Sequence, residues 1–325
     1  MWAYYDPREL GWAKLGTGTL EAPSPEERAC IAMFAEHGVL LSPDLPIAAW
    51  PARKPLVPTS FVPARVSDDP ARVGDDVRAW IAATEGTGQV PFAIPIDEPH
   101  GADAMATVRT LAREVRAAGG GAGRFIFAVT ADPSSELGDV DLVITPNAKL
   151  ADPALRWSYN GAPPRAGAMV VDGESPGPRT WGWIAWRYHI PVWYVWDALY
   201  WHDRHNAKRA RRPLPGRVLD VASDARSFDD GEDHGNLDGV LALPGDAQQP
   251  CKPTLQLESL RRGQQDRQLL ELAFACAPGP TAELAAKLVP EALGDAGAEP
   301  SWPRDEAAWE AARRELLRLA TGCAH

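Results

Sequence analysis

The residues with the clearest chemical potential are two adjacent carboxylates, Asp97 and Glu98, which are followed by Pro99. They come directly after the apolar run 92–96, which is typical of a buried strand that the proline would end. In a parallel α/β barrel the carboxyl ends of the strands carry the active site, so we expect the pair there. Two carboxylates in a partly dry site do not both ionise easily, so one keeps its proton and can act as a general acid. The motif therefore predicts acid–base catalysis.

A simpler structural interpretation of the pair stays open from the sequence. Asp97 could cap a helix that begins near Gly101, because aspartate is a favoured N-cap residue. Glu98 would then be a solvated acid in the first helical turn. A lone motif of this kind is weak evidence, but the strand-like run before it favours the catalytic interpretation.

Tryptophan is unusually frequent, with 13 Trp against 7 Phe and 6 Tyr. Its flat face can stack on a sugar ring, and its indole N–H can bond a hydroxyl. Trp157 and Tyr159 lie two residues apart on an expected strand and therefore share a face. We expect these two side chains, with Trp196 and Trp201, to line a sugar pocket. The alternative for all four is packing in an aromatic core.

Asn147, Asp197 and His100 are further candidates for contacts with a substrate. Asn147 and Asp197 follow expected strands, and His100 lies close to Glu98. The alternatives are a loop cap for Asp197 and a solvated side chain for His100. The H-D-x-H run at 202–205 indicates exposed side chains, because no third His or Cys stands at ligand spacing. We expect no metal, and no nucleotide cofactor because no glycine-rich phosphate-binding motif follows a strand.

These candidates need a scaffold of alternating strands and helices. Helical spacing of apolar residues, with suitable caps, predicts helices at 25–37, 75–83, 102–118, 179–188, 257–274 and 305–320. Short apolar and β-branched runs predict strands at 39–42, 90–96, 124–130, 141–145, 155–159, 191–200 and 237–243. Such a series favours an α/β fold of the (β/α)8 TIM-barrel type, as one domain over residues 1–325.

Composition excludes several classes of function. The chain has 33 Lys and Arg against 44 Asp and Glu, a net charge of −11, so we expect neither a nucleic-acid partner nor an anionic membrane surface. No apolar run is long enough to span a bilayer. The first residues lack the features of a secretory signal, so we expect a cytoplasmic location unless the chain is a piece of a longer secreted or periplasmic protein. The four widely spaced cysteines indicate free, mostly buried thiols.

Four stretches of the chain resemble the catalytic domain of glycoside hydrolase family 123 and the uncharacterised domain family related to it. They occur in the family's order over residues 90–275. They are the strand ending in Asp97-Glu98-Pro99; L-R-W-S-Y-N-G at 155–161; R-T-W-G-W-I-A-W-R-Y at 179–188, leading to Trp196; and G-V-L-A-L-P-G at 239–245, followed by L-E-S-L-R-R-G at 257–263 and Asp266. The order of these stretches is more specific than any single motif.

The resemblance implies a TIM-type barrel, here without the N-terminal β-sandwich common in the family, and a carbohydrate substrate with no cofactor. It implies a retaining hydrolase of β-linked N-acetylgalactosamine or a related N-acetylhexosaminide. In that chemistry the sugar's own 2-acetamido oxygen attacks the anomeric carbon, so the enzyme needs no nucleophile. Glu98 would protonate the leaving oxygen and later activate water. Asp97 would accept the acetamido N–H and stabilise the cationic intermediate.

Departures from the family pattern keep other functions open. The differing positions, with the usual family residue in brackets, are Leu243 (Tyr), Gln256 (Arg) and Val192 (Gly). A barrel with an ordinary two-carboxylate mechanism would pair Glu98 with Glu174 or Asp197. A carbohydrate-binding protein without turnover is the third possibility, which the residues at 243 and 256 favour.

Overall fold

The computed structural model describes residues 1–16, 18–57, 60–121, 123–132, 137–146, 156–171, 173–201, 221 and 237–322. Within these ranges eight strands form one parallel sheet: β1 (Trp2–Ala3), β2 (Leu40–Leu41), β3 (Phe61–Pro63), β4 (Val90–Ala93), β5 (Ile126–Val129), β6 (Leu142–Ile144), β7 (Arg156–Tyr159) and β8 (Val192–Val195). Each strand from β3 to β7 pairs with the next in sequence, and β8 pairs with β1, which pairs with β2. The predicted α/β class and parallel sheet are confirmed.

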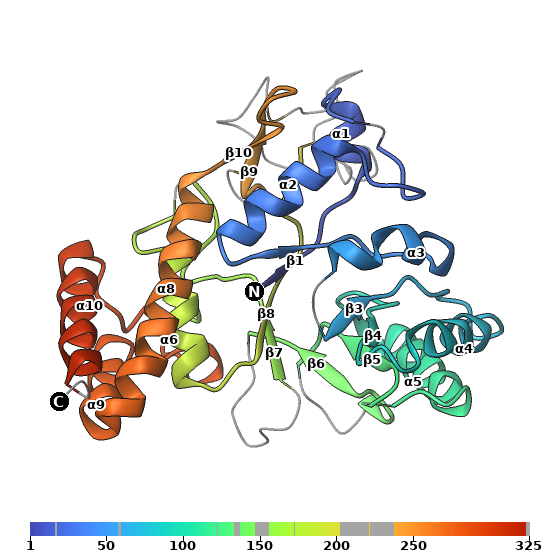
Figure 1. Ribbon diagram of the computed structural model, residues 1–325. Coiled ribbons are helices and arrows are strands. Elements are labelled where there is room, and N and C mark those ends of the chain that lie inside the picture. The colour runs from blue at the N-terminus through green and yellow to red at the C-terminus, as the bar shows by residue number, and fades with distance from the viewer. Residues whose placement is uncertain are drawn as a thin grey trace.

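Six helices agree closely with the predicted segments: α2 (Pro25–Glu36), α4 (Val73–Thr84), α5 (Gly101–Ala117), α6 (Arg179–Arg187), α8 (Leu255–Cys276) and α10 (Glu306–Thr321). The helical elements that were not predicted are α1 (Arg8–Trp12), η1 (Ile47–Ala49), α3 (Trp50–Arg53), η2 (Lys54–Leu56), α9 (Pro278–Leu288) and η4 (Leu293–Asp295). In Figure 1, α4 and α5 lie beside β3–β5, whereas α6, α8, α9 and α10 gather on the other side of the molecule. None of the described helices is long and apolar enough to cross a membrane.

The sheet curls around an inner face to which all eight strands contribute apolar side chains. The rings of Trp2 in β1 and Phe92 in β4 have centroids 5.2 Å apart, and so do those of Phe61 in β3 and Trp157 in β7. These pairs join strands that are not neighbours in the sheet. Such contacts are possible only because the sheet bends until distant strands face one another.

The two edge strands of the sheet also approach each other at their carboxyl ends. Leu45, just after β2, forms a parallel bridge with Ala64, just after β3. The Leu45 carbonyl accepts the Arg65 N–H at 2.7 Å, and the Leu45 N–H reaches the Pro63 carbonyl at 3.4 Å. The contact is a single bridge rather than a ladder, so full closure into a (β/α)8 barrel stays a prediction. The single domain over residues 1–325 also stays a prediction.

The prediction that residues 237–243 form a strand of the parallel sheet is wrong. The last residues of this segment belong to β9 (Ala242–Pro244), which pairs antiparallel with β10 (Cys251–Pro253) in a separate two-stranded sheet. The apolar content of the segment indicates a strand, but it does not reveal which partner the strand has. The strands predicted at 90–96 and 191–200 are also shorter than expected, ending at Ala93 and Val195.

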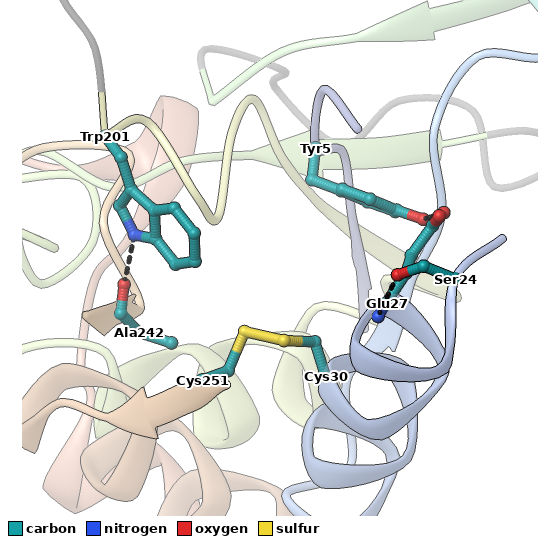
Figure 2. The surroundings of a disulfide bond; sticks show 7 residues. All are labelled: Tyr5, Ser24, Glu27, Cys30, Trp201, Ala242 and Cys251. Carbon is teal, nitrogen blue, oxygen red and sulfur yellow. Dashed lines mark hydrogen bonds between the residues drawn. A yellow bond between two sulfur atoms is a disulfide. The ribbon is translucent and has the colours of Figure 1, made fainter. Parts of the chain in front are cut away.

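The predicted free thiols are wrong for every cysteine that the structure describes. Cys30 in α2 is bonded to Cys251 in β10, across 221 residues of sequence, and Figure 2 shows this bridge between the two elements. Cys276 is disulfide-bonded too, while Cys323 lies outside the described residues. The spacing of the cysteines could not predict this, because the pairing depends on how α2 packs near β10.

Candidate functional site

Thr130 holds Asp97 and Glu98 in place at the carboxyl ends of the parallel strands. We call this side of the sheet its carboxyl edge. Thr130 directly follows β5 and is buried. Its hydroxyl donates to Asp97 Oδ1 and accepts the backbone N–H of Glu98, with an N···O distance of 2.7 Å. One hydroxyl therefore fixes the side chain of Asp97 and the backbone of Glu98 together.

Glu98 has a left-handed backbone, with φ of 42°. This conformation is uncommon for a residue with a Cβ and costs on the order of 1–2 kcal/mol. The hydrogen bond from its N–H to Thr130 helps to hold it. Residues in such sparsely populated conformations concentrate at functional sites, so the geometry favours a functional role for this turn.

The side chain of Glu98 reaches across the carboxyl edge to β7. Tyr159, at the end of that strand, donates its hydroxyl hydrogen to Glu98 Oε1 at 2.8 Å. Burial is the largest cause that raises the pKa of Tyr159, followed by its hydrogen bond to Glu98 and by the charges of Glu98, Asp97 and Asp132. The phenol therefore keeps its proton and acts as a hydrogen-bond donor to the carboxylate.

The helix-cap interpretation of the pair does not agree with these contacts. The N-cap residue of α5 is His100, and no side chain accepts a capping hydrogen bond there. Asp97 bonds to the strand-end Thr130 instead of the helix. Both carboxylate residues are exposed at the carboxyl edge, where a substrate could reach them.

Asp44 and Arg65 belong to the same edge, and the sequence reasoning missed both of them. Asp44 lies three residues after β2, and burial raises its pKa to about 6; the charge of Arg65 opposes the shift and that of Asp97 adds to it. Burial also raises the pKa of Tyr194 in β8, with the charges of Asp44 and Asp97 as further causes. Asp44 lies two residues after the strand predicted at 39–42, so the strand-end reasoning that selected Asn147 could have found Asp44 too.

The two predicted pocket walls on β7 have different surroundings. Tyr159 is partly buried and contacts Glu98 directly. Trp157, only 2% exposed, packs inside the curled sheet, edge-on to Phe61 and to Phe92 at 5.2 Å and 4.8 Å between ring centroids. The structure brings Tyr159 to the carboxylate pair and places Trp157 in the layer beneath it.

The two later tryptophans do not join this group. Trp201 is 0% exposed and donates its indole N–H to the Ala242 carbonyl at 2.7 Å, so it belongs to the core rather than to an open pocket. Trp196 is partly buried, packs against Tyr200 with ring centroids 5.0 Å apart, and donates its backbone N–H to Asn160 Oδ1. The expectation that both line a sugar pocket is therefore not met for Trp201.

The polar candidates are also dispersed. Asp197 is buried and accepts the Leu199 N–H at 2.9 Å, which is the loop cap considered as its alternative. His100 is exposed at the start of α5. Asn147 and the H-D-x-H run at 202–205 lie outside the described residues. In the part of the chain that the structure describes, no group of three or more His, Cys, Asp or Glu side chains could hold a metal ion.

Comparisons with known proteins add little to this geometry. No protein-family model matches the chain, and neither does any curated protein. One solved structure that is similar comes from a study of glycolipid glycan hydrolysis by a family 123 glycoside hydrolase from Clostridium perfringens. The two chains are 11% identical in sequence, and their structures superpose with a TM-score of 0.38. The match covers 76% of this chain and 43% of the other, so this chain spans less than half the length of that protein. A likeness of this extent does not establish a shared family or function.

Proposed function

We propose that the protein is a glycoside hydrolase that acts on β-linked N-acetylhexosaminides by substrate assistance, with Asp97 and Glu98 as its catalytic residues. The observation that carries the proposal is the way Thr130 and Tyr159 orient the two carboxylates. Thr130 binds Asp97 and the backbone of Glu98, and Tyr159 binds the Glu98 carboxylate. A preorganised acidic pair at the carboxyl edge of a parallel sheet is typical of α/β enzymes.

In the first step the acetamido oxygen of the sugar would attack the anomeric carbon. The bond from that carbon to the leaving oxygen breaks as Glu98 gives its proton to the leaving oxygen. Asp97 accepts the acetamido N–H, and its negative charge stabilises the oxazolinium ion that forms. The enzyme forms no covalent bond with the sugar in this scheme.

In the second step water would attack the anomeric carbon and open the oxazoline ring. Glu98, now a carboxylate, takes a proton from that water, so that its original state returns. Two displacements at the same carbon leave its configuration unchanged. Tyr159 supports both steps, because its hydroxyl holds one oxygen of Glu98 and leaves the carboxyl group in a fixed orientation.

The two-carboxylate alternative receives less support from the surroundings of its proposed partners. Glu174 forms an ion pair with Arg304 at 2.9 Å on the exterior of the molecule. Asp197 is buried and bonds to its own loop. Neither has a contact with Glu98 among the hydrogen bonds and ion pairs of the described residues.

The test is a screen of aryl β-glycosides with and without a 2-acetamido group. Hydrolysis of acetamido sugars only, with retention of configuration by NMR, is the expected result. Hydrolysis of plain hexosides would contradict substrate assistance and favour two carboxylates. Binding without hydrolysis would favour the carbohydrate-binding protein.

We further infer that the chain folds in an oxidising compartment. Disulfides rarely persist in the reducing cytosol, yet Cys30 is bonded to Cys251 and Cys276 is also in a disulfide. These bonds support a secreted or periplasmic location over the cytoplasmic one expected from the first residues.

A further inference from the structure

A polar cavity of about 280 Å³ opens at the carboxyl edge of the sheet. Three strands contribute to its wall through the segments that follow them: Asp44 follows β2, Arg65 follows β3, and Ile94 and Pro95 follow β4. Pro95 is two residues before Asp97. The cavity and the catalytic pair are therefore parts of the same edge.

Asp44 and Arg65 are residues of opposite charge in the lining of this cavity, one after β2 and one after β3. Within the described residues neither forms a side-chain hydrogen bond or an ion pair, although Arg65 acts on Asp44 through its charge. The Arg65 backbone is fixed at both ends, because its N–H donates to the Leu45 carbonyl and its own carbonyl accepts the Trp80 indole N–H at 3.3 Å. A carboxyl group and a guanidinium group on a rigid wall, both unpaired, are groups that a polar ligand can satisfy.

Asp97 acts through its charge on both sides of this part of the edge. Its charge raises the pKa of Tyr159, which bonds to Glu98, and it also raises the pKa of Asp44. Glu98 acts on Tyr159 but is not among the charges that act on Asp44. The charge of Asp97 therefore acts both on the residue that bonds to Glu98 and on the acid that lines the cavity.

Because Pro95 lines the cavity two residues before Asp97, one 2-acetamido sugar ring could meet both the pair and the cavity. In the proposed function Glu98 meets the leaving oxygen on carbon 1, and Asp97 meets the acetamido group on carbon 2. The next substituents around the ring are the hydroxyls on carbons 3 and 4, which would extend toward the cavity. The cavity is near the lower end of the usual range for ligand pockets, roughly 300–1,000 Å³, so it suits part of one sugar ring rather than an oligosaccharide.

Resting on the proposed function, we propose that Asp44 and Arg65 bind the 3- and 4-hydroxyls of the same sugar whose acetamido group meets Asp97. A carboxylate accepts from a hydroxyl and a guanidinium donates to one, so neighbouring hydroxyls can bond to both groups. Asp68, which also lines the cavity, leaves the site with two acids and one cation. An acidic sugar would be repelled, and a neutral one fits.

The experiment compares kcat/KM on 4-nitrophenyl N-acetyl-β-D-galactosaminide and on its 3-deoxy and 4-deoxy analogues. The wild type should lose about 10- to 100-fold on at least one analogue, the size expected for a hydrogen bond to a charged group. In Asp44→Asn and Arg65→Gln, kcat/KM on the parent substrate should also fall by about 10- to 100-fold. On the deoxy analogue that is a poor substrate for the wild type, these variants should show little further decrease in kcat/KM. Asp139→Asn and Arg124→Gln change exposed residues at the opposite edge, three positions before β6 and two before β5, and should behave as the wild type.

A full additional loss on the deoxy substrates in both Asp44→Asn and Arg65→Gln would overturn the proposal, because the deleted hydroxyls would then act independently of these residues. If the wild type hydrolyses no acetamido glycoside, the proposed function fails, and an NMR titration with the methyl β-glycoside of N-acetylgalactosamine tests the subsite by itself. Binding weakened about tenfold by Asp44→Asn would support the subsite. Unchanged binding, or none in the wild type, would overturn it. Arg65 is exposed, so its variant tests the site even if Asp44→Asn folds poorly.

Discussion

The hydroxyl of Tyr159 lies 2.8 Å from Glu98 Oε1 and joins two residues that are 61 positions apart. Tyr159 ends β7, whereas Glu98 follows β4, and β5 and β6 lie between these strands in the sheet. The hydrogen bond is therefore possible only because the sheet curls. It converts an exposed glutamate into one with a defined orientation at the carboxyl edge.

Tyr159→Phe should lower activity without unfolding the protein. The substitution keeps the ring and removes the donor that holds Glu98, so kcat/KM on an acetamido glycoside should fall by about 5- to 50-fold. KM should change less than kcat, because the hydroxyl orients the catalytic acid rather than the sugar. An unchanged kcat would show that the Tyr159 hydroxyl has no positioning role.

Tyr188→Phe is the matched control for that variant. The Tyr188 hydroxyl accepts the Ala292 N–H at 2.9 Å, a contact within the core that involves no residue of the carboxyl edge. Loss of this hydrogen bond should lower the free energy of unfolding by about 1 kcal/mol. The activity per folded molecule should stay the same, which urea unfolding and initial rates measure together.

Thr130→Val tests the residue that holds the pair together. Valine matches the shape of threonine but neither donates to Asp97 nor accepts from the Glu98 N–H, so both anchors are lost. We expect a fall in kcat of about 10- to 100-fold. Thr130→Ser keeps the hydroxyl and should stay within a few-fold of the wild type. Equal losses in the two variants would mean that packing, not the hydroxyl, matters here.

The sequence predicted the elements that have strong local signals. Ser24, followed by Pro25 and two glutamates, marks the start of α2, and in the structure the Ser24 side chain caps the Glu27 N–H. The strands β1 and β3, of two and three residues, were missed, and length alone does not explain this, because β2 and β6 are as short and were predicted. Position along the chain also could not reveal that β9 pairs with β10 rather than with the large sheet.

The position of Asp97 and Glu98 at the end of a strand could be predicted from the sequence, but most of their surroundings could not. Asp97 and Glu98 follow a long apolar run, which is a local signal. The roles of Thr130 and Tyr159 depend on β5 and β7 meeting the loop after β4, which is a tertiary property. The burial of Trp201 could not be predicted, because an amphipathic tryptophan in an aromatic core has the same sequence signature as one in a sugar pocket.

Asp44 should give the stability of the protein a distinctive pH dependence. Its pKa is about 6 in the folded chain against an ordinary value of 3.8, so between those values the folded state holds a proton that the unfolded state has lost. Stability from this group is therefore present below pH 4 and is lost as the pH rises through 6, by about 3 kcal/mol. Relative to the wild type, Asp44→Asn should gain stability between pH 4 and pH 7 in urea unfolding. Asp139→Asn should show no such trend, and a trend of the opposite sign for Asp44→Asn would contradict the burial of this carboxyl.

The Cys30–Cys251 disulfide should contribute strongly to stability. It closes a loop that covers 221 residues of sequence separation, so its removal should cost about 3–5 kcal/mol through the greater freedom of the unfolded chain. The double variant Cys30→Ala, Cys251→Ala should therefore unfold at a lower urea concentration than the unreduced wild type. Mass spectrometry after alkylation under denaturing, non-reducing conditions provides the direct check. Alkylation of either cysteine in protein purified from an oxidising compartment would contradict the disulfide.

The catalytic roles of the pair are tested most directly by initial rates on aryl N-acetyl-β-D-galactosaminides with leaving groups of graded acidity. Glu98→Gln removes the proton donor, so its loss should be largest for poor leaving groups, about 10²–10⁴-fold, and small for activated ones. Asp97→Asn removes the charge that stabilises the oxazolinium ion, so its loss should be the same across the series. Both changes conserve volume, and neither should unfold the protein. Equal, leaving-group-independent losses in both variants, or unchanged rates in either, would contradict the roles assigned to Asp97 and Glu98.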